Sequence, residues 1–291
     1  MLYSMTGFGR AESAVNDRQV VAEIRSLNGK LFDVSAKLPP VLKAYELDIR
    51  SLLNGMLIRG TLDITVSIRQ EGASRPMTVN TALAGYYYQS MRQIAQELAI
   101  PEEQVLATLM RMPEVVAPDQ DVLAEEEWVH VKAVIEAAAG QLTEHRRKEG
   151  ASLEHDLMLR ISNIERLLEQ VHPLEAQRTE RVRTRIRQSL EEMIGSDKTD
   201  PNRLEQEMIY YIERMDFSEE KTRLTQHCIY FREILNRNDI AKGKMLGFTL
   251  QEIGREINTL GAKANDAGIQ QLVIQMKDEL EKSKEQVLNV L

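Results

Sequence analysis

The sequence contains a single cysteine, Cys228, among its 291 residues. No disulfide can form within the chain, and a lone thiol on an apolar stripe is typical of a protein in a reducing compartment. The sequence also lacks a run of about 18 apolar residues that could cross a membrane, and it does not open with the basic-then-apolar pattern of a secretory signal. We therefore expect a cytoplasmic protein without a membrane partner.

Aromatic residues are scarce, at 5% of the chain. This scarcity argues against a platform of stacked rings as the main means of holding a nucleic acid. Basic residues are outnumbered as well, since 37 Lys and Arg face 45 Asp and Glu, and the formal net charge is −8. A protein of this charge that acts on a polyanion needs a local basic patch, bound metal ions, or both.

Strand patterns are concentrated in the N-terminal part of the chain. Asn28-Gly29 is a strong signal for a tight hairpin turn, and a turn-prone stretch ends at Asn16-Asp17. A helix is expected over residues 41–53. Together, these strand, turn and helix patterns predict a small β-rich sheet domain over residues 1–120. Strands are expected over three segments, at residues 19–24, 31–38 and 61–68.

From residue 81 onward the apolar spacing is helical, and no convincing strand is found. His172-Pro173 predicts a helix boundary, because proline fits the first turn of a helix better than its interior. We therefore expect a long helical hairpin over residues 121–202 and a helical domain over residues 203–291. The predicted fold class is α+β.

Two amphipathic helices dominate the last of these domains. Ser218 is a good N-cap for the first helix, and acids in its first turn suit the helix dipole. The second helix combines an apolar stripe with an unusually polar opposite face. Its stripe consists of Leu246, Leu250, Ile253, Ile257, Leu260 and Ala264.

Motifs at both ends of the chain occur together in a known family. Near the N-terminus they are Ser4-Met5-Thr6-Gly7-Phe8-Gly9-Arg10, Glu23-Ile24-Arg25-Ser26-Leu27-Asn28 and Arg59-Gly60. In the C-terminal part they are Arg203-Leu204-Glu205-Gln206-Glu207, Asp216, Glu219-Glu220, Arg223-Leu224, His227, Gly243, Leu246, Phe248, Gln251-Glu252, Arg255-Glu256, Asn258-Thr259 and Lys263. On these residues the chain resembles the YicC/YloC family of bacterial endoribonucleases. It departs from many relatives at Gly247, where they carry Asp, and at Ala262, where they carry Ser.

The resemblance implies an endoribonuclease that cleaves phosphodiester bonds of cellular RNA and depends on a divalent metal cation, Mn²⁺ or Mg²⁺. RNA is the expected partner, and DNA is not. A homo-oligomer is also expected, because long exposed hairpins bury their seams against copies of themselves. The alternative is a non-catalytic, oligomeric RNA-binding adaptor that recruits a nuclease.

Acidic residues could hold the metal ions that polarise a phosphoryl oxygen and activate water. From spacing alone, ion pairs on a solvated helix face are the favoured interpretation, and the resemblance reverses that preference. The proposed metal ligands are Glu205, Asp216, Glu219, Glu220, Glu252 and Glu256.

Four other polar residues of the same helices are the catalytic candidates. His227 could transfer a proton, contact phosphate or bind metal, although a lone helical histidine is more often structural. Arg223, Arg255 and Lys263 could hold phosphate oxygens or simply neutralise neighbouring acids.

The most basic segment of the chain precedes these helices, with five arginines between residues 178 and 187. It suits an RNA backbone, and pairing with acids of a neighbouring helix is an equally good interpretation. Arg10 and Arg25 are further candidates in the sheet domain, where the segment from Ser4 to Arg10 is expected to serve close strand packing. The proposed RNA-binding residues are Arg178, Arg181, Arg185, Arg10 and Arg25.

Overall fold

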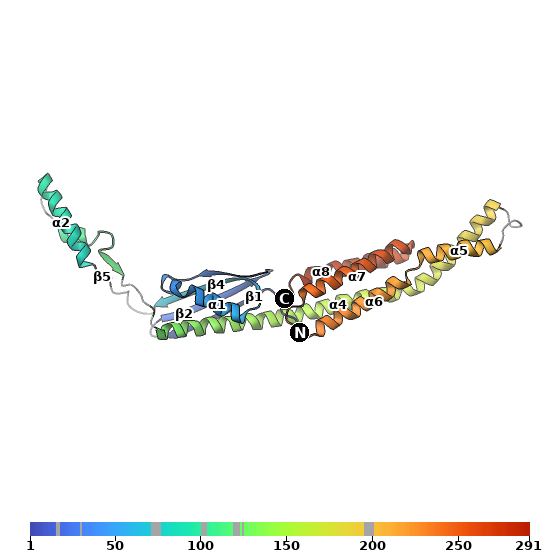
Figure 1. The fold of residues 1–291 in the computed structure, drawn as a ribbon, viewed down its shortest axis with the longest axis horizontal. Helices are drawn as coiled ribbons and strands as arrows, with labels where there is room; N and C mark the ends of the chain where they lie inside the picture. Colours follow the sequence, from blue (N-terminus) through green and yellow to red (C-terminus); the bar gives the residue numbers. More distant parts are fainter. Residues whose placement is uncertain are drawn as a thin grey trace.

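The computed structural model describes residues 1–15, 18–29, 31–70, 77–99, 104–118, 123, 125–194 and 201–291. The predicted turn at Asn16-Asp17 lies outside this part of the chain. The fold is α+β, as expected: an N-terminal sheet is followed by one long helix and a group of C-terminal helices (Figure 1).

The sheet has four strands in the order β1-β2-β4-β3. β1 pairs with β2 and β2 with β4 in antiparallel fashion, whereas β3 runs parallel to β4. Apolar residues such as Ile24 and Ile64 alternate with polar ones and form one fully buried face. The strands are β1 (Gly7–Val15), β2 (Arg18–Leu27), β3 (Phe32–Lys37) and β4 (Gly60–Gln70).

The predicted hairpin at Asn28-Gly29 is wrong, because β4 lies between β2 and β3. β3 instead reaches β4 through a 3-10 helix (Pro40–Tyr45) and α1 (Glu46–Met56), which is the crossover that a parallel pair requires. Asn28 does not form a hairpin turn but contacts the C-terminal part of the chain, since its side-chain amide nitrogen donates to the Leu288 carbonyl at 2.6 Å.

A small arm extends from one end of the sheet domain (Figure 1). It comprises β5 (Met77–Val79), α2 (Thr81–Leu98), α3 (Val105–Leu109) and β6 (Val116–Pro118), and β5 pairs with β6. β6 corrects the expectation that no strand follows residue 81. None of the residues in α2 is buried.

α4 (Glu125–Ile194) is a single helix of 70 residues and forms the spine of the molecule (Figure 1). It passes through Pro173, so the predicted hairpin is wrong. An interior proline costs about 3 kcal/mol. Here the buried Val171 and the half-buried Leu174 pack into the helical core on both sides of Pro173, and this packing holds the two halves in one helix.

The N-terminal half of α4 packs on the sheet and the C-terminal half on the last helices, which makes two hydrophobic cores. The predicted stripe of α7 is confirmed, because all six of its residues are fully buried, as is Cys228. No helix in the described ranges is long and apolar enough to span a membrane. The C-terminal helices are α5 (Pro201–Met215), α6 (Ser218–Asn236), α7 (Gly243–Ala264) and α8 (Ala267–Val287).

The expectation of close packing in the segment from Ser4 to Arg10 is confirmed. A Cβ added to Gly9 would lie 2.1 Å from the Ala138 carbonyl oxygen of α4. Ser4 forms a bridge with Val290, and the backbone nitrogens of Lys242 and Gly243 donate to the Leu291 carbonyl at 2.8 and 2.9 Å. The two cores are therefore joined where the N-terminal strand, α4 and the last residues meet.

Candidate active site

The α6/α7 hairpin carries most of the predicted site residues. Asp216, just before α6, accepts hydrogen bonds from the backbone nitrogen and hydroxyl of Ser218 at 3.0 and 2.6 Å. Ser218 is therefore the first residue of α6 rather than its cap, and Asp216 supplies the capping oxygen. These hydrogen bonds from Ser218, followed by the charges of Lys263 and Lys221, lower the pKa of Asp216.

Glu220 and Lys263 form a partly buried ion pair between the two helices. Lys263 Nζ lies 2.7 Å from Glu220 Oε1. The Glu220 residue is only 7% exposed, and its Oε2 is buried without a hydrogen-bond partner among the described residues. An unsatisfied buried carboxylate oxygen is costly, so Oε2 needs a partner that the described residues do not supply.

Arg178 fixes the ends of this hairpin from α4. Its Nη2 donates to the carbonyls of Met215 at 2.9 Å and Lys263 at 3.3 Å, and its guanidinium lies 5.1 Å from the centre of the Phe217 ring. The residue is 5% exposed, and burial lowers its pKa. The expected RNA contact at Arg178 is therefore corrected to a structural role in this fold, because a guanidinium so enclosed cannot reach a phosphate.

Two other predicted groups lie on the exposed surface as local ion pairs. Glu219 pairs with Arg223 within α6, and Glu252 pairs with Arg255 at 2.8 Å within α7. Exposed pairs of this spacing contribute about 0.3–0.5 kcal/mol. Either arginine can therefore leave its partner for a phosphate at little cost, so the pairs do not decide between the two interpretations.

His227 and Glu256 lie farther along the hairpin. His227 is seven residues after Glu220, and Glu256 is seven residues before Lys263. Because Glu220 and Lys263 touch across antiparallel helices, an equal advance of about 10 Å on each brings His227 and Glu256 to the same level. His227 is half-buried and Glu256 is buried.

The described residues do not form a complete metal site. No group of three or more His, Cys, Asp or Glu side chains within them could hold an ion. Glu205 lies in α5, but its side chain is outside the part of the chain that the structure describes. The acids that are described are divided between the Glu220 end of the hairpin and the region around Glu252 and Glu256.

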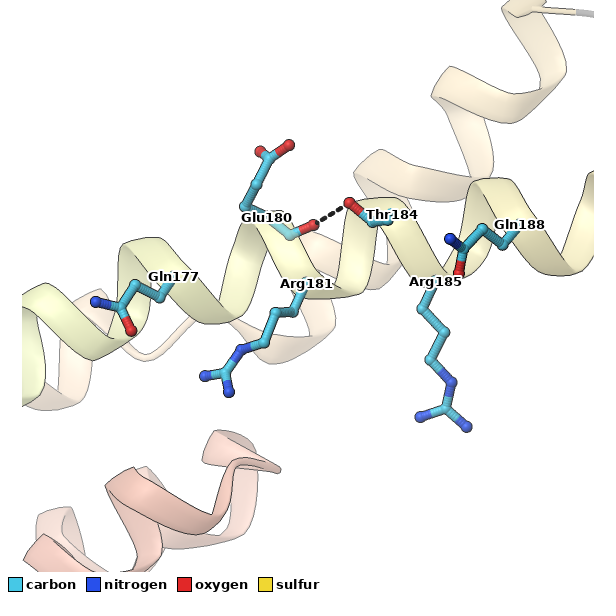
Figure 2. A pocket seen from close by; sticks show the side chains of 6 residues that line it. All are labelled: Gln177, Glu180, Arg181, Thr184, Arg185 and Gln188. Carbon is cyan, nitrogen blue, oxygen red and sulfur yellow. Dashed lines mark hydrogen bonds between the residues drawn. The ribbon is translucent and has the colours of Figure 1, made fainter.

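The remaining predicted RNA contacts lie on two separate surfaces. Arg181 and Arg185 project from the same side of α4 and line an open hollow with Gln177, Glu180, Thr184 and Gln188 (Figure 2). Arg181 pairs with Asp266 of α8 at 2.6 Å but remains 62% exposed. On the sheet, Arg10 pairs with Glu12 and Glu23 at 3.1 and 3.6 Å.

The buried Arg146 and the half-buried Arg160 of α4 have structural contacts that the sequence does not predict. Arg146 donates to the carbonyls of Met5 at 3.4 Å and Arg59 at 3.1 Å, and to the Ser26 hydroxyl. Its place four residues after the stripe residue Leu142 is a signal that could have identified it.

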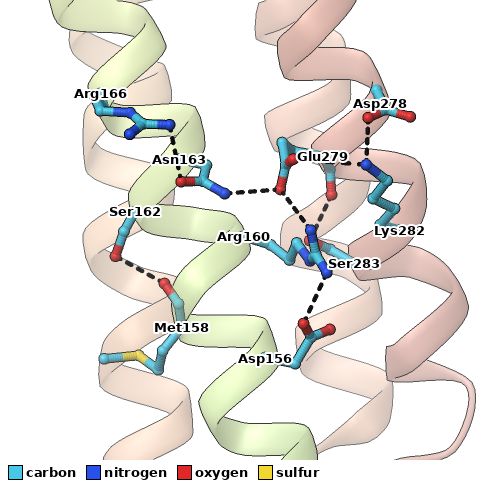
Figure 3. Close-up of polar contacts among 10 residues, drawn as sticks. All are labelled: Asp156, Met158, Arg160, Ser162, Asn163, Arg166, Asp278, Glu279, Lys282 and Ser283. Carbon is cyan, nitrogen blue, oxygen red and sulfur yellow. Dashed lines mark hydrogen bonds and ion pairs between the residues drawn. The ribbon is translucent and has the colours of Figure 1, made fainter.

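Arg160 pairs with Asp156 within α4 at 3.0 Å and with Glu279 of α8 at 3.3 Å, and so joins the two helices (Figure 3). The hydrogen bond to Asp156 raises the pKa of Arg160. Asn163 donates to the same Glu279 carboxylate at 3.1 Å. This network holds the α8 side of the helical core against the spine.

Comparison with known proteins covers almost the whole chain. Residues 2–155 match the N-terminal region of endoribonuclease YicC-like proteins, and residues 163–291 match the C-terminal region of the same proteins. A "Probable endoribonuclease YicC" of Haemophilus influenzae is 30% identical over 295 residues, and one of Clostridioides difficile is 27% identical over 297 residues. Both alignments cover 100% of each chain. The chain belongs to the YicC-like family of endoribonucleases.

Proposed function

We propose that this protein is a metal-dependent endoribonuclease that cleaves cellular RNA at the α6/α7 hairpin. The family supports the activity, because the relatives are named as probable endoribonucleases. The observation that best supports this location is the partly buried Glu220–Lys263 pair, in which Glu220 Oε2 has no hydrogen-bond partner among the described residues. Lys263 and the exposed Arg223 and Arg255 supply positive charge for the phosphate.

His227 is the proposed proton-transfer group. It is the only histidine of the hairpin, and it lies at the same level along the two helices as the buried Glu256. His227 could give a proton to the leaving oxygen of the cleaved bond.

Dependence on Mn²⁺ or Mg²⁺ is part of the proposal. Mg²⁺ is commonly held by one or two carboxylates together with substrate phosphates and water, rather than by a cage of protein ligands. Glu220, with its free Oε2, and Asp216 are the acids that suit such a site. When bound, the ion would neutralise charge on the phosphate.

We also propose that the protein acts as a homo-oligomer. The side chains of Tyr86, Ile94 and Leu98 in α2 and of Leu106 in α3 are exposed, although all are large and apolar. Apolar side chains that gather on one arm mark an interaction surface, and a second copy of the chain offers the same surface. Sedimentation velocity tests this: a monomer at micromolar concentration would contradict it.

Cleavage of a labelled, structured RNA with Mn²⁺, with Mg²⁺ and with EDTA tests the function. We expect internal cuts with at least one of the two ions and none with EDTA. Binding of the RNA without cleavage under any of the three conditions would instead favour the adaptor that recruits a nuclease. Cleavage that persists in EDTA would support the endoribonuclease activity and contradict its dependence on a metal ion.

A further inference from the structure

The sheet face turned away from α4 carries an exposed aromatic ring beside a cation. Phe8 of β1 lies opposite Arg25 of β2 in the antiparallel register. The Arg25 guanidinium lies 5.7 Å from the centre of the Phe8 ring, and Phe8 is 41% exposed. The apolar Leu27 is exposed on the same face, two residues along β2.

The backbone geometry explains why this ring is presented to solvent. Gly7 and Gly9 face α4 so closely that added Cβ atoms would lie 2.8 Å from the Leu142 side chain and 2.1 Å from the Ala138 carbonyl oxygen. Neighbouring residues in a strand point to opposite faces, so Phe8 must point away from α4. The ring is therefore held outward by the close packing on either side of it.

An open hollow of about 550 Å³ lies at the ring, within the range of roughly 300–1,000 Å³ that is usual for ligand pockets. His145 and Glu149 of α4 also line the hollow, at the edge of the sheet beside Thr6, whose hydroxyl donates to Glu149 Oε2 at 2.9 Å. The Ser26 hydroxyl at its edge donates to the Met5 carbonyl at 2.7 Å. These bonds fix the walls before any ligand binds.

The charge of Arg25 is available to a ligand. Unlike Arg10, which pairs with two acids, Arg25 makes no ion pair with any residue that the structure describes. Its guanidinium therefore offers five donors beside an exposed π-face. This combination suits a ligand with a flat ring attached to an anion.

We propose that this hollow binds one unpaired nucleotide of the RNA substrate, with the base stacked on Phe8 and the adjoining phosphate at Arg25. Proteins recognise unpaired RNA through stacking on aromatic rings and arginine planes, whereas a base inside a duplex has no free face. The inference rests on the proposed function and narrows its substrates to RNAs that contain an unpaired stretch. A bound protein segment is the competing occupant, but an arginine without an ion pair to the described residues, next to an exposed ring, favours a phosphate with its base.

The test compares Phe8→Ala and Arg25→Gln with the wild type in binding a labelled oligouridine RNA and a blunt RNA duplex. Stacking is worth about 1–3 kcal/mol per base, so Phe8→Ala should weaken oligouridine binding about 5- to 150-fold. Its salt dependence should stay unchanged, because no charge is lost. Arg25→Gln should flatten the logarithmic salt slope by about 0.7. Duplex affinity should change little in Phe8→Ala, and Phe8→Trp should restore oligouridine binding.

Tyr230→Ala is the matched control. Tyr230 is 42% exposed and has the Arg237 guanidinium 5.4 Å from its ring centre, but it lies on α6 far from the sheet. The inference is overturned if Phe8→Ala and Tyr230→Ala bind oligouridine with equal affinity. If the wild type still cleaves RNA in that case, the proposed function is unaffected. A change in sedimentation of Phe8→Ala with unchanged RNA affinity would assign the face to a second copy. A wild type that neither binds nor cleaves RNA would instead overturn the proposed function.

Discussion

Replacement of Arg178 by Gln separates a structural arginine from an RNA-binding one. The side chain is buried, donates to two backbone carbonyls and lies over the Phe217 ring. Hydrogen bonds from charged donors contribute about 1.5–3 kcal/mol each, and a cation–π contact adds about 0.5–2 kcal/mol. Gln can recover part of one bond, so we expect a loss of about 2–4 kcal/mol in the free energy of unfolding.

The assay is urea unfolding, with RNA affinity measured at several salt concentrations. Arg185→Gln is the matched control, because Arg185 is exposed on the same helix two turns away. The control should unfold within about 0.5 kcal/mol of the wild type and should flatten the logarithmic salt slope by about 0.7 if Arg185 holds a phosphate. Arg178→Gln with wild-type stability and a flatter salt slope would refute the structural role.

Two further predictions concern packing and pH. Gly9→Ala should lower the free energy of unfolding by about 1–3 kcal/mol, because the added Cβ would lie 2.1 Å from the backbone of α4. Gly140→Ala should instead stabilise the helix by up to about 1 kcal/mol, because a Cβ there has nothing within 4 Å. Equal thermal midpoints for the two variants would contradict this prediction. The lowered pKa of Asp216 means that its bonds to Ser218 stabilise the fold above the ordinary carboxyl pKa, near 3.9, and are lost as pH falls through the lowered value. The stability difference between wild type and Asp216→Asn should therefore shrink in acid, and a constant difference down to the acid transition would exclude this contribution.

Local periodicity was enough to predict the fold class and the α7 stripe. Leu246 to Ala264 repeat at helical spacing and are all buried, and the alternating residues of β4 form a central strand. The partner of each strand was not predictable in the same way. The Asn28-Gly29 turn signal is local, whereas the place of β4 beside β2 depends on packing against α1 and α4.

Two errors along the spine have a common physical cause. Intrinsic preference alone favours a helix end at Pro173, and at Arg178 a cation that contacts RNA or pairs with acids of a neighbouring helix. Tertiary packing overrides both: the core encloses the helix on each side of Pro173, and the backbone carbonyls of Met215 and Lys263 enclose the guanidinium. For the candidate site, the spacing predicts that Lys263 contacts phosphate or neutralises one of several acids, but it does not single out Glu220, which Lys263 contacts across the hairpin.

The central claim is that the α6/α7 hairpin carries out the chemistry, and the single-turnover cleavage rate of Glu220→Gln tests it most directly. The matched control is Glu281→Gln on α8, where the carboxylate is exposed and, among the residues that the structure describes, pairs with Lys284 alone. We expect Glu220→Gln to lose nearly all cleavage at saturating RNA while RNA affinity stays within a few fold. In the same assay His227→Ala should be slower by about 10²- to 10⁴-fold. A Glu220→Gln protein that is folded, binds RNA and cleaves it as fast as Glu281→Gln would contradict the account.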